Sequence, residues 1–292
     1  MNRKLLIGKP VSENIKKSLV EKINSLSKKN IIPKLAAILV GDDPASKIYV
    51  KSKHKTFLKF NCQSEIHHFL NDSNENDICD LISRLNKDKS THGILLQLPL
   101  PLHLNSKRIL DSIDPNKDVD GLHPMNLGRL LQGNPNFIPC TPYGCLEILR
   151  YYKINVKSKH VVVIGRSNLV GKPIAALLSQ KFDIGNSTVT LCHSQTKNLS
   201  KYTKMADVII VAVGIPAMLK SNMVKKDAVV IDVGINRVDD DSQKGYHIIG
   251  DADYSSLINK VSSITPVPGG VGPMTITMLL NNTIASAEKT II

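Results

Sequence analysis

The 292-residue chain has no tryptophan, and aromatic residues make up only 4% of it. Its five cysteines are odd in number and form no C-x-x-C pair, which argues against a disulfide framework or a structural zinc site. Apolar runs are short, and the N-terminus has neither the signal-peptide nor the transit-peptide pattern. From these absences we expect a soluble protein of a reducing compartment, the cytoplasm.

Acidic residues are fewer than basic ones, 25 against 38, and the formal net charge is +13. Only seven of the basic residues are arginine, and the lysines are scattered rather than gathered in blocks. A nucleic-acid-binding surface is usually a clustered, arginine-rich stripe with aromatic residues that stack on bases. We therefore predict a solvated, lysine-rich surface that attracts small anions, and no nucleic-acid or membrane partner. A basic nucleic-acid-binding module is the alternative.

Strand-like and helix-like segments alternate along the whole chain, which is typical of α/β domains with a parallel sheet. The length suffices for two domains. A helix is predicted between Asp43 and Asn61, because Asp43 is a suitable N-cap and Pro44 a suitable first residue. Strands are predicted over 34–41, 93–100, 160–165, 187–192, 206–214 and 227–234, and helices over 171–182 and from Pro273 onward.

The second half of the chain places Gly165 directly after its first predicted strand, which indicates a doubly wound, Rossmann-type nucleotide domain. The turn GRSNLVGKP has Ser167 where the dinucleotide pattern G-x-G-x-x-G has its second glycine. No acidic residue follows the next strand, whereas an NAD site usually places one there. With Arg166 nearby, this pattern favours the 2′-phosphate of NADP. The alternative is that His193 and Ser194 are ordinary loop residues.

The predicted helix after Asp43 carries four residues on one face, namely Tyr49, Lys53, Phe57 and Phe60. Other lysines of this helix share a different face, so Lys53 lies on an apolar stripe. Burial disfavours the ammonium form and lowers the pKa of a lysine, which gives a base that works near neutral pH. The alternative is that Lys53 lays its methylene groups along the stripe and extends its amine to water.

Gln97 and an acidic loop follow this helix. Gln97 lies near the end of the predicted strand GILLQLPL, where ligands of open α/β sheets bind; the alternative is an amide bonded to a neighbouring loop. In KDVDG, Asp118 and Asp120 resemble the start of a calcium loop, but the glycine comes too early and no glutamate closes the pattern. We expect no metal there. A carboxylate in this loop suits the two N–H donors of a planar heterocycle.

Near the C-terminus, the segment ITPVPGGVGPMT sets three glycines between prolines. The result is a stiff loop whose backbone can approach a ligand closely and which ends at a helix N-terminus. It completes a series of motifs that occur in this order: YVKSK, QLPLPLH, KDVDGLHP, PCTPYG, GRSNLVGKP, DVGIN and PVPGGVGPMT. In these motifs the chain resembles the bifunctional methylenetetrahydrofolate dehydrogenase/methenyltetrahydrofolate cyclohydrolase family over essentially its whole length.

The resemblance implies roles for individual residues. Lys53 is the implied cyclohydrolase catalyst. Three further residues complete the implied catalytic set: Tyr49 stacks on the folate, Gln97 bonds the lysine, and Asp120 anchors the pterin ring. The implied folate contacts also include Leu96, Leu98, Pro268, Gly269, Gly270, Val271 and Gly272. The implied NADP contacts are Gly165, Arg166, Ser167, Ser194 and Ile235. Gln195 departs from the basic residue that many members carry near the 2′-phosphate.

The implied activity is NADP-dependent oxidation of 5,10-methylenetetrahydrofolate to 5,10-methenyltetrahydrofolate, followed by hydrolysis to 10-formyltetrahydrofolate. These steps belong to one-carbon metabolism, which serves purine, methionine and histidine biosynthesis. The family also implies a homodimer. The positive charge favours polyglutamylated tetrahydrofolates. Another two-domain NADP-dependent oxidoreductase, acting on a small acid, is the alternative, although it has no use for the predicted catalytic set.

The family arrangement implies two α/β domains with the active site in the cleft between them. The N-terminal catalytic domain is expected to span residues 1–140 and to be completed by the C-terminal helix, residues 273–292. The Rossmann-type NADP-binding domain is expected to span residues 141–272. The proline-rich segment PNFIPCTPYG lies at the predicted boundary between the halves.

Overall fold

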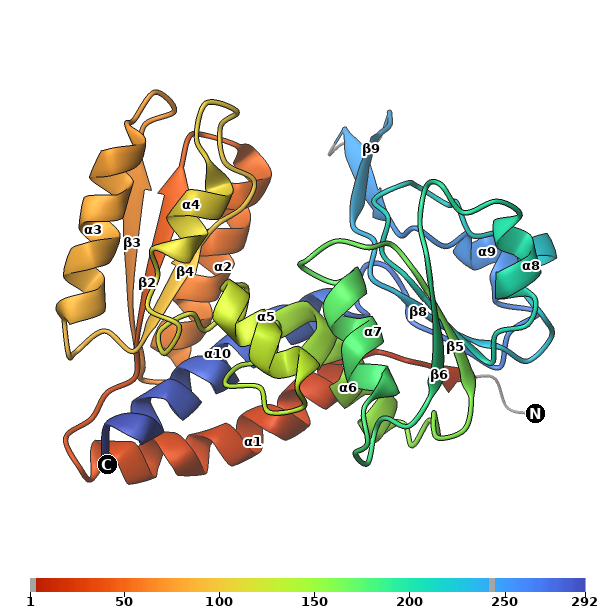
Figure 1. Cartoon of the computed structure of the whole chain (residues 1–292), viewed down its shortest axis with the longest axis horizontal. Coiled ribbons are helices and arrows are strands. Elements are labelled where there is room, and N and C mark those ends of the chain that lie inside the picture. Colours follow the sequence, from red (N-terminus) through yellow and green to blue (C-terminus); the bar gives the residue numbers. More distant parts are fainter. Residues whose placement is uncertain (1–3, 242–244, 292) are drawn as a thin grey trace. The chain divides into compact units, whose positions relative to one another are not determined.

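The computed structural model describes residues 4–241 and 245–291, and these fall into two compact units (Figure 1). We call residues 4–14 with 141–275 the six-stranded unit, and residues 15–140 with 276–291 the three-stranded unit, after their sheets. The chain passes between the units within α1 (Gly8–Ser27), at the start of α6 (Cys140–Tyr151) and within α10 (Gly272–Glu288). Residues 1–3 and 292, which belong to the predicted catalytic domain, lie outside the described residues.

The six-stranded unit is built on a parallel sheet in the order β1–β11–β8–β7–β5–β6. Its strands are β1 (Lys4–Leu5), β5 (His160–Ile164), β6 (Thr188–Cys192), β7 (Val208–Val211), β8 (Val229–Asp232) and β11 (Ser263–Ile264). The central strands are rich in buried valine and isoleucine, as expected for a parallel sheet. Strands β6 and β7 lie on opposite sides of β5, so the strand order reverses there, which is where nucleotides bind in doubly wound folds.

Short helices and one hairpin complete this unit. The hairpin pairs β9 (Asn236–Asp239) with β10 (Tyr246–Ile249) in antiparallel fashion. The helical segments are α7 (Gly171–Ser179), α8 (Leu199–Thr203), η1 (Ser221–Met223) and α9 (Tyr254–Leu257). The strands and the helix predicted for this half of the chain are confirmed. Two of the strands end early: β7 stops at Val211 and β8 at Asp232, because the residues that follow turn into loops whose N–H groups bond to buried aspartates.

The three-stranded unit has a parallel sheet in the order β3–β2–β4, formed by β3 (Gln63–Phe69), β2 (Lys34–Val40) and β4 (Gly93–Leu96). Helices α2 (Pro44–Lys59) and α3 (Glu75–Lys87) cover its two faces (Figure 1). The remaining helical segments are α4 (Ser106–Asp111), α5 (Pro124–Leu131) and η2 (Lys289–Ile291). The strand predicted over 93–100 is shorter than expected, because Pro99 and Pro101 have no N–H group to continue a ladder.

Helix α2 forms where the sequence predicts it. The Asp43 side chain caps its N-terminus by accepting a hydrogen bond from the Ser46 N–H at 2.7 Å. Its buried residues include Val50, Lys53 and Phe57, so the predicted apolar stripe faces the protein interior. Within the described part of the chain, no helix combines the length and the apolar character that a bilayer crossing demands.

Candidate active site

Lys53 lies on the buried face of α2, and only 5% of its surface is exposed. Its Nζ donates a hydrogen bond to Gln97 Oε1 at 2.9 Å and lies 4.6 Å from the centre of the Tyr49 ring. The alternative in which Lys53 extends its amine to water is therefore excluded. The structure thus brings together three of the four residues of the predicted catalytic set in direct contact.

Burial is the main influence on the Lys53 amine. It lowers the pKa of Lys53 from its ordinary value, because an ammonium ion loses hydration in the protein interior. The Asp120 carboxylate opposes this effect and raises the pKa, so the fourth predicted catalytic residue acts on the same amine. The neighbouring Cys140 thiol stays neutral, because its own pKa is raised by complete burial and by Asp120. Asp120 therefore offsets part of the desolvation of Lys53, and the pKa of the amine remains lowered.

Gln97 is oriented by the end of β4. Its backbone N–H donates to the Ile38 carbonyl at 2.9 Å, and its Nε2 donates to the Leu98 carbonyl at 2.8 Å. This second bond leaves Oε1 turned toward Lys53, so the amide accepts from the amine. Of the two predicted leucine contacts, Leu96 is buried in the core of the unit and Leu98 packs against that core.

The loop that carries Asp120 is held by a neighbour that the sequence did not single out for this purpose. Asp118 is 2% exposed and accepts hydrogen bonds from the N–H groups of Leu122 and His123 at 3.2 and 2.8 Å, and from Asn126 Nδ2 at 2.8 Å. Burial raises the pKa of Asp118 to about 6. The two aspartates of KDVDG therefore differ: Asp118 organises the loop, and the half-buried Asp120 influences Lys53.

Asn282, on the C-terminal helix, fixes the same loop from the other side. Its Nδ2 donates to the carbonyl oxygens of Val119 at 2.9 Å and Ile138 at 3.0 Å. The sequence carried a signal for this role, since Asn282 interrupts an apolar stretch of α10 and a buried amide there needs partners. Among residues 4–241 and 245–291, no cluster of three or more histidine, cysteine, aspartate or glutamate side chains has the grouping of a metal site.

A larger cavity, of about 460 Å³, lies in the six-stranded unit at the carboxyl ends of β5, β6 and β7. Four of the predicted NADP contacts line it: Gly165, Arg166, Ser167 and Ser194. Gly165 has φ +120°, and a Cβ there would collide with the Ala212 carbonyl oxygen, so the turn requires glycine. Ser167 Oγ accepts a hydrogen bond from the Val170 N–H at 3.1 Å just before α7.

The chemistry of this larger cavity fits a dinucleotide that carries a 2′-phosphate. None of the described residues that line it is acidic, and Arg166 contributes a cationic side chain. The segment after β6 is held by a hydrogen bond from the His193 N–H to Thr196 Oγ1 at 2.9 Å, and both residues line the cavity. His193 and Ser194 are therefore wall residues of a cavity rather than part of a plain surface loop.

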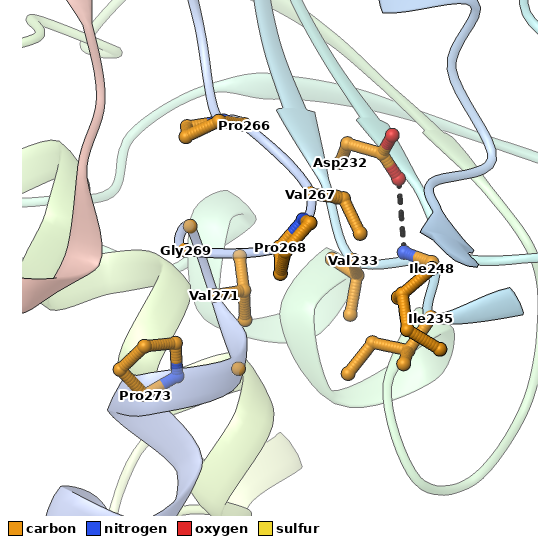
Figure 2. A pocket seen from close by; sticks show the side chains of 13 residues that line it. Asp232, Val233, Ile235, Ile248, Pro266, Val267, Pro268, Gly269, Val271 and Pro273 are labelled. Atoms are coloured by element: carbon orange, nitrogen blue, oxygen red, sulfur yellow. Dashed lines mark hydrogen bonds between the residues drawn. The ribbon is translucent and has the colours of Figure 1, made fainter. Parts of the chain in front are cut away.

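A smaller cavity, of about 180 Å³, lies in the same unit beside the glycine-rich loop (Figure 2). Its wall includes the predicted loop residues, listed in sequence order as Pro268, Gly269, Gly270, Val271 and Gly272. Figure 2 shows Ile235 and Ile248 facing Pro268 and Val271, with Val233 between them. Ile235 is thus the one predicted NADP contact that lines the smaller cavity instead of the larger.

Asp232 supports the wall of the smaller cavity and was not identified from the sequence. Its carboxylate accepts from the Gly234 N–H at 2.9 Å, the bond drawn in Figure 2, and from the N–H groups of Asp251 and Ala252 at 3.0 and 2.9 Å. Burial raises the pKa of Asp232 to about 6. The three hydrogen bonds act in the opposite direction, because they stabilise the carboxylate, but burial has the larger effect. The sequence signal for Asp232 was the DVGIN motif, in which a role was predicted only for Ile235.

Comparison with known proteins identifies relatives of the whole chain. Residues 6–120 match the family description "Tetrahydrofolate dehydrogenase/cyclohydrolase, catalytic domain", and residues 139–291 match the corresponding "NAD(P)-binding domain". The "Bifunctional protein FolD" of Chlamydia felis is 49% identical over 286 residues, which cover 98% of this chain and 99% of that protein.

Solved structures agree with this assignment. The bifunctional enzyme FolD-methylenetetrahydrofolate dehydrogenase/cyclohydrolase from Campylobacter jejuni has a TM-score of 0.92 and 48% identity, covering 98% of this chain and 99% of that chain. The Trypanosoma brucei N5,N10-methylenetetrahydrofolate dehydrogenase-cyclohydrolase, complexed with NADP cofactor and inhibitor, has a TM-score of 0.93 and 33% identity. The match covers 99% of this chain and 98% of that chain.

Proposed function

The chain belongs to the tetrahydrofolate dehydrogenase/cyclohydrolase family, and we propose how its residues divide the two reactions of that family between them. The enzyme oxidises 5,10-methylenetetrahydrofolate to 5,10-methenyltetrahydrofolate and hydrolyses this product to 10-formyltetrahydrofolate. The observation that carries the proposal is the buried Lys53 amine, which is bonded to Gln97 and lies beside the Tyr49 ring.

The dehydrogenase step uses NADP, which accepts the hydride that leaves the bridging methylene of the folate. Gly165, Arg166, Ser167 and Ser194 would hold the larger part of the cofactor in the larger cavity, and Ile235 would contact it at the smaller one. The absence of an acidic side chain from the described wall of the larger cavity supports NADP over NAD, and so does the NADP complex of the Trypanosoma brucei relative.

In the cyclohydrolase step, water attacks the methenyl carbon and gives up a proton to the neutral Lys53 amine. The bond from this carbon to N5 of the folate then breaks as the hydroxyl oxygen forms the C=O of the formyl group on N10. The hydroxyl loses its proton and N5 gains one, so the net product besides 10-formyltetrahydrofolate is the single proton that Lys53 accepted. A neutral amine suits this role, because an ammonium ion would be repelled by the methenyl cation. Gln97 holds the amine in place by accepting its hydrogen bond, Tyr49 stacks on the folate, and Asp120 anchors the pterin ring.

The remaining substrate contacts that we propose are Leu96, Leu98 and the loop Pro268–Gly272. The functional division of the chain is then residues 1–140 with 273–292 for folate chemistry, and residues 141–272 for NADP. We further propose a cytoplasmic homodimer that accepts polyglutamylated folates, which the net charge of +13 favours, and that serves purine, methionine and histidine biosynthesis.

The proposal is tested by comparing wild type with Lys53→Met in two assays. Wild type is expected to reduce NADP, and NAD far more slowly, when 5,10-methylenetetrahydrofolate is added. Lys53→Met should lose about 100-fold or more in methenyltetrahydrofolate hydrolysis, because the proton acceptor is gone, and should keep part of its NADP reduction. Normal hydrolysis by Lys53→Met would overturn the role of Lys53, and equal use of NAD and NADP would overturn the cofactor assignment.

A further inference from the structure

Asp251 is a fully buried aspartate between β10 and α9, with 0% of its surface exposed. Its Oδ2 accepts hydrogen bonds from the N–H groups of Val213 at 2.6 Å and Gly214 at 2.9 Å. Its Oδ1 accepts from Asn236 Nδ2 at 2.8 Å. One carboxylate therefore accepts from three N–H donors of two separate segments, the loop that follows β7 and the first residue of β9.

These two segments adjoin the two cavities that carry the predicted NADP contacts. Val213 lines the larger cavity, and Asn236 directly follows Ile235, which lines the smaller cavity. A second connection joins Asp251 to the smaller cavity, because its backbone N–H donates to Asp232 Oδ1 at 3.0 Å. The spacing between the two walls is thus set by a buried side chain that lines neither cavity.

We propose that Asp251 is a positioning residue for the cofactor: it holds the loop with Val213 and the start of β9 at the spacing that lets one dinucleotide contact both cavities. This inference rests on the proposed use of NADP, whose expected contacts are divided between the two cavities. Asp251 touches no reacting atom and acts through the two segments that it binds.

The donors around Asp251 match a carboxylate. Each of its oxygens faces donors: Oδ2 faces two backbone N–H groups and Oδ1 faces an amide NH₂. An asparagine at position 251 would direct its own NH₂ at one of these donors, or would require the Asn236 amide to turn over. The turn would set Asn236 Oδ1 against the Ile249 carbonyl, which Nδ2 now faces at 3.4 Å. Either arrangement is unfavourable in a buried site, and the segment concerned is expected to move away.

A second substitution should restore the hydrogen bonds that Asp251→Asn loses. In the double variant Asp251→Asn with Asn236→Asp, the oxygen of the new amide can accept from Val213 and Gly214 while its NH₂ donates to the new carboxylate at position 236. Each donor around position 251 then has an acceptor again, with the acid now at position 236 and the amide at position 251. A side chain that merely filled space would give no such rescue.

The experiment measures NADP affinity, the KM for NADP and methenyltetrahydrofolate hydrolysis in four full-length variants: Asp251→Asn, Asn236→Ala, the double variant and Asp253→Asn. Asp251→Asn should weaken NADP binding about tenfold. Hydrolysis should be impaired far less than NADP binding, because Lys53 and Gln97 belong to the other unit. Asn236→Ala should weaken NADP binding less, and the double variant should recover a large part of the loss. Asp253→Asn, two residues away and capping α9, should bind NADP normally.

Each outcome bears on the proposal. NADP binding by Asp251→Asn that equals wild type, or a double variant no better than Asp251→Asn, overturns it. If Asp251→Asn does not fold, which loss of hydrolysis would reveal, Asn236→Ala decides: an unchanged KM for NADP overturns the proposal. Failure of wild type to bind NADP would contradict the proposed cofactor instead, so the two ideas fail in different ways.

Discussion

A lysine accepts a proton only in its neutral form, and in this protein burial is what favours that form. The Lys53 side chain is almost completely enclosed, and its pKa is lowered for that reason. The one carboxylate that counteracts burial is Asp120, which we also assign to the pterin ring. The two residues are therefore coupled, and a change at Asp120 is expected to alter the titration of Lys53 as well as substrate binding.

Replacing Asp120 with asparagine tests this coupling. Removal of the negative charge destabilises the ammonium form of Lys53. The pKa of Lys53 therefore falls further, and the amine stays neutral to lower pH. The kcat of methenyltetrahydrofolate hydrolysis, measured over roughly pH 5 to 9, should then keep its plateau to lower pH than in wild type. Asp114→Asn, in the same loop, serves as the control and should leave the profile in place. A profile of Asp120→Asn that moves to higher pH would contradict the coupling.

The sequence predicted the buried face of α2 better than it predicted the residues that support the site. The spacing of Tyr49, Lys53 and Phe57 already indicated one buried helical face, because helical periodicity is a local property. Asp118, Asn282 and Asp251 could not be assigned their roles in the same way. Each binds backbone or side-chain groups that the chain brings close only after folding, such as the Val119 carbonyl for Asn282.

At the scale of elements, the turn between β5 and α7 depends on one glycine. Gly165→Ala would force a side chain onto a backbone with φ +120° and against the Ala212 carbonyl. We expect this variant to lose most NADP binding while it still hydrolyses methenyltetrahydrofolate, because the turn belongs to the six-stranded unit. Isothermal titration with NADP and the hydrolysis assay measure the two effects. Retention of wild-type NADP affinity would contradict the role of this turn.

Gly128 is the matched control for that variant. It lies within α5, and no atom would come within 4 Å of an added Cβ. Gly128→Ala should therefore raise the free energy of unfolding by about 0.5–1 kcal/mol, because alanine favours the helix, and should leave NADP binding unchanged.

Strands that carry an apolar run of several residues were predicted well, and strands without such a run were missed. The apolar runs that became β2, β5 and β8 are buried parallel strands, and such runs are visible in the sequence. In contrast, β3 is an edge strand with several exposed polar residues, and β9 and β10 form a separate hairpin. Their residues do not form the continuous apolar pattern on which the predictions depended.

For the whole molecule, the residues proposed for proton transfer and those proposed for NADP binding belong to different units. Lys53, Gln97, Tyr49 and Asp120 belong to the three-stranded unit, whereas both cavities with the expected NADP contacts belong to the six-stranded unit. This separation is why single substitutions are expected to impair one activity and spare the other. For Lys53, the central proposal is local: burial lowers the pKa of its amine and so favours the neutral form that accepts a proton.

The pKa of Lys53 can be measured directly by NMR. In protein labelled with ¹³C-lysine, the Cε resonance of Lys53 is assigned as the signal that disappears in Lys53→Met, and its chemical shift is followed as pH is raised. We expect Lys53 to titrate well below the exposed lysines, which should remain at about 10.4. A Lys53 resonance that titrates together with the exposed lysines, or at higher pH, would contradict it.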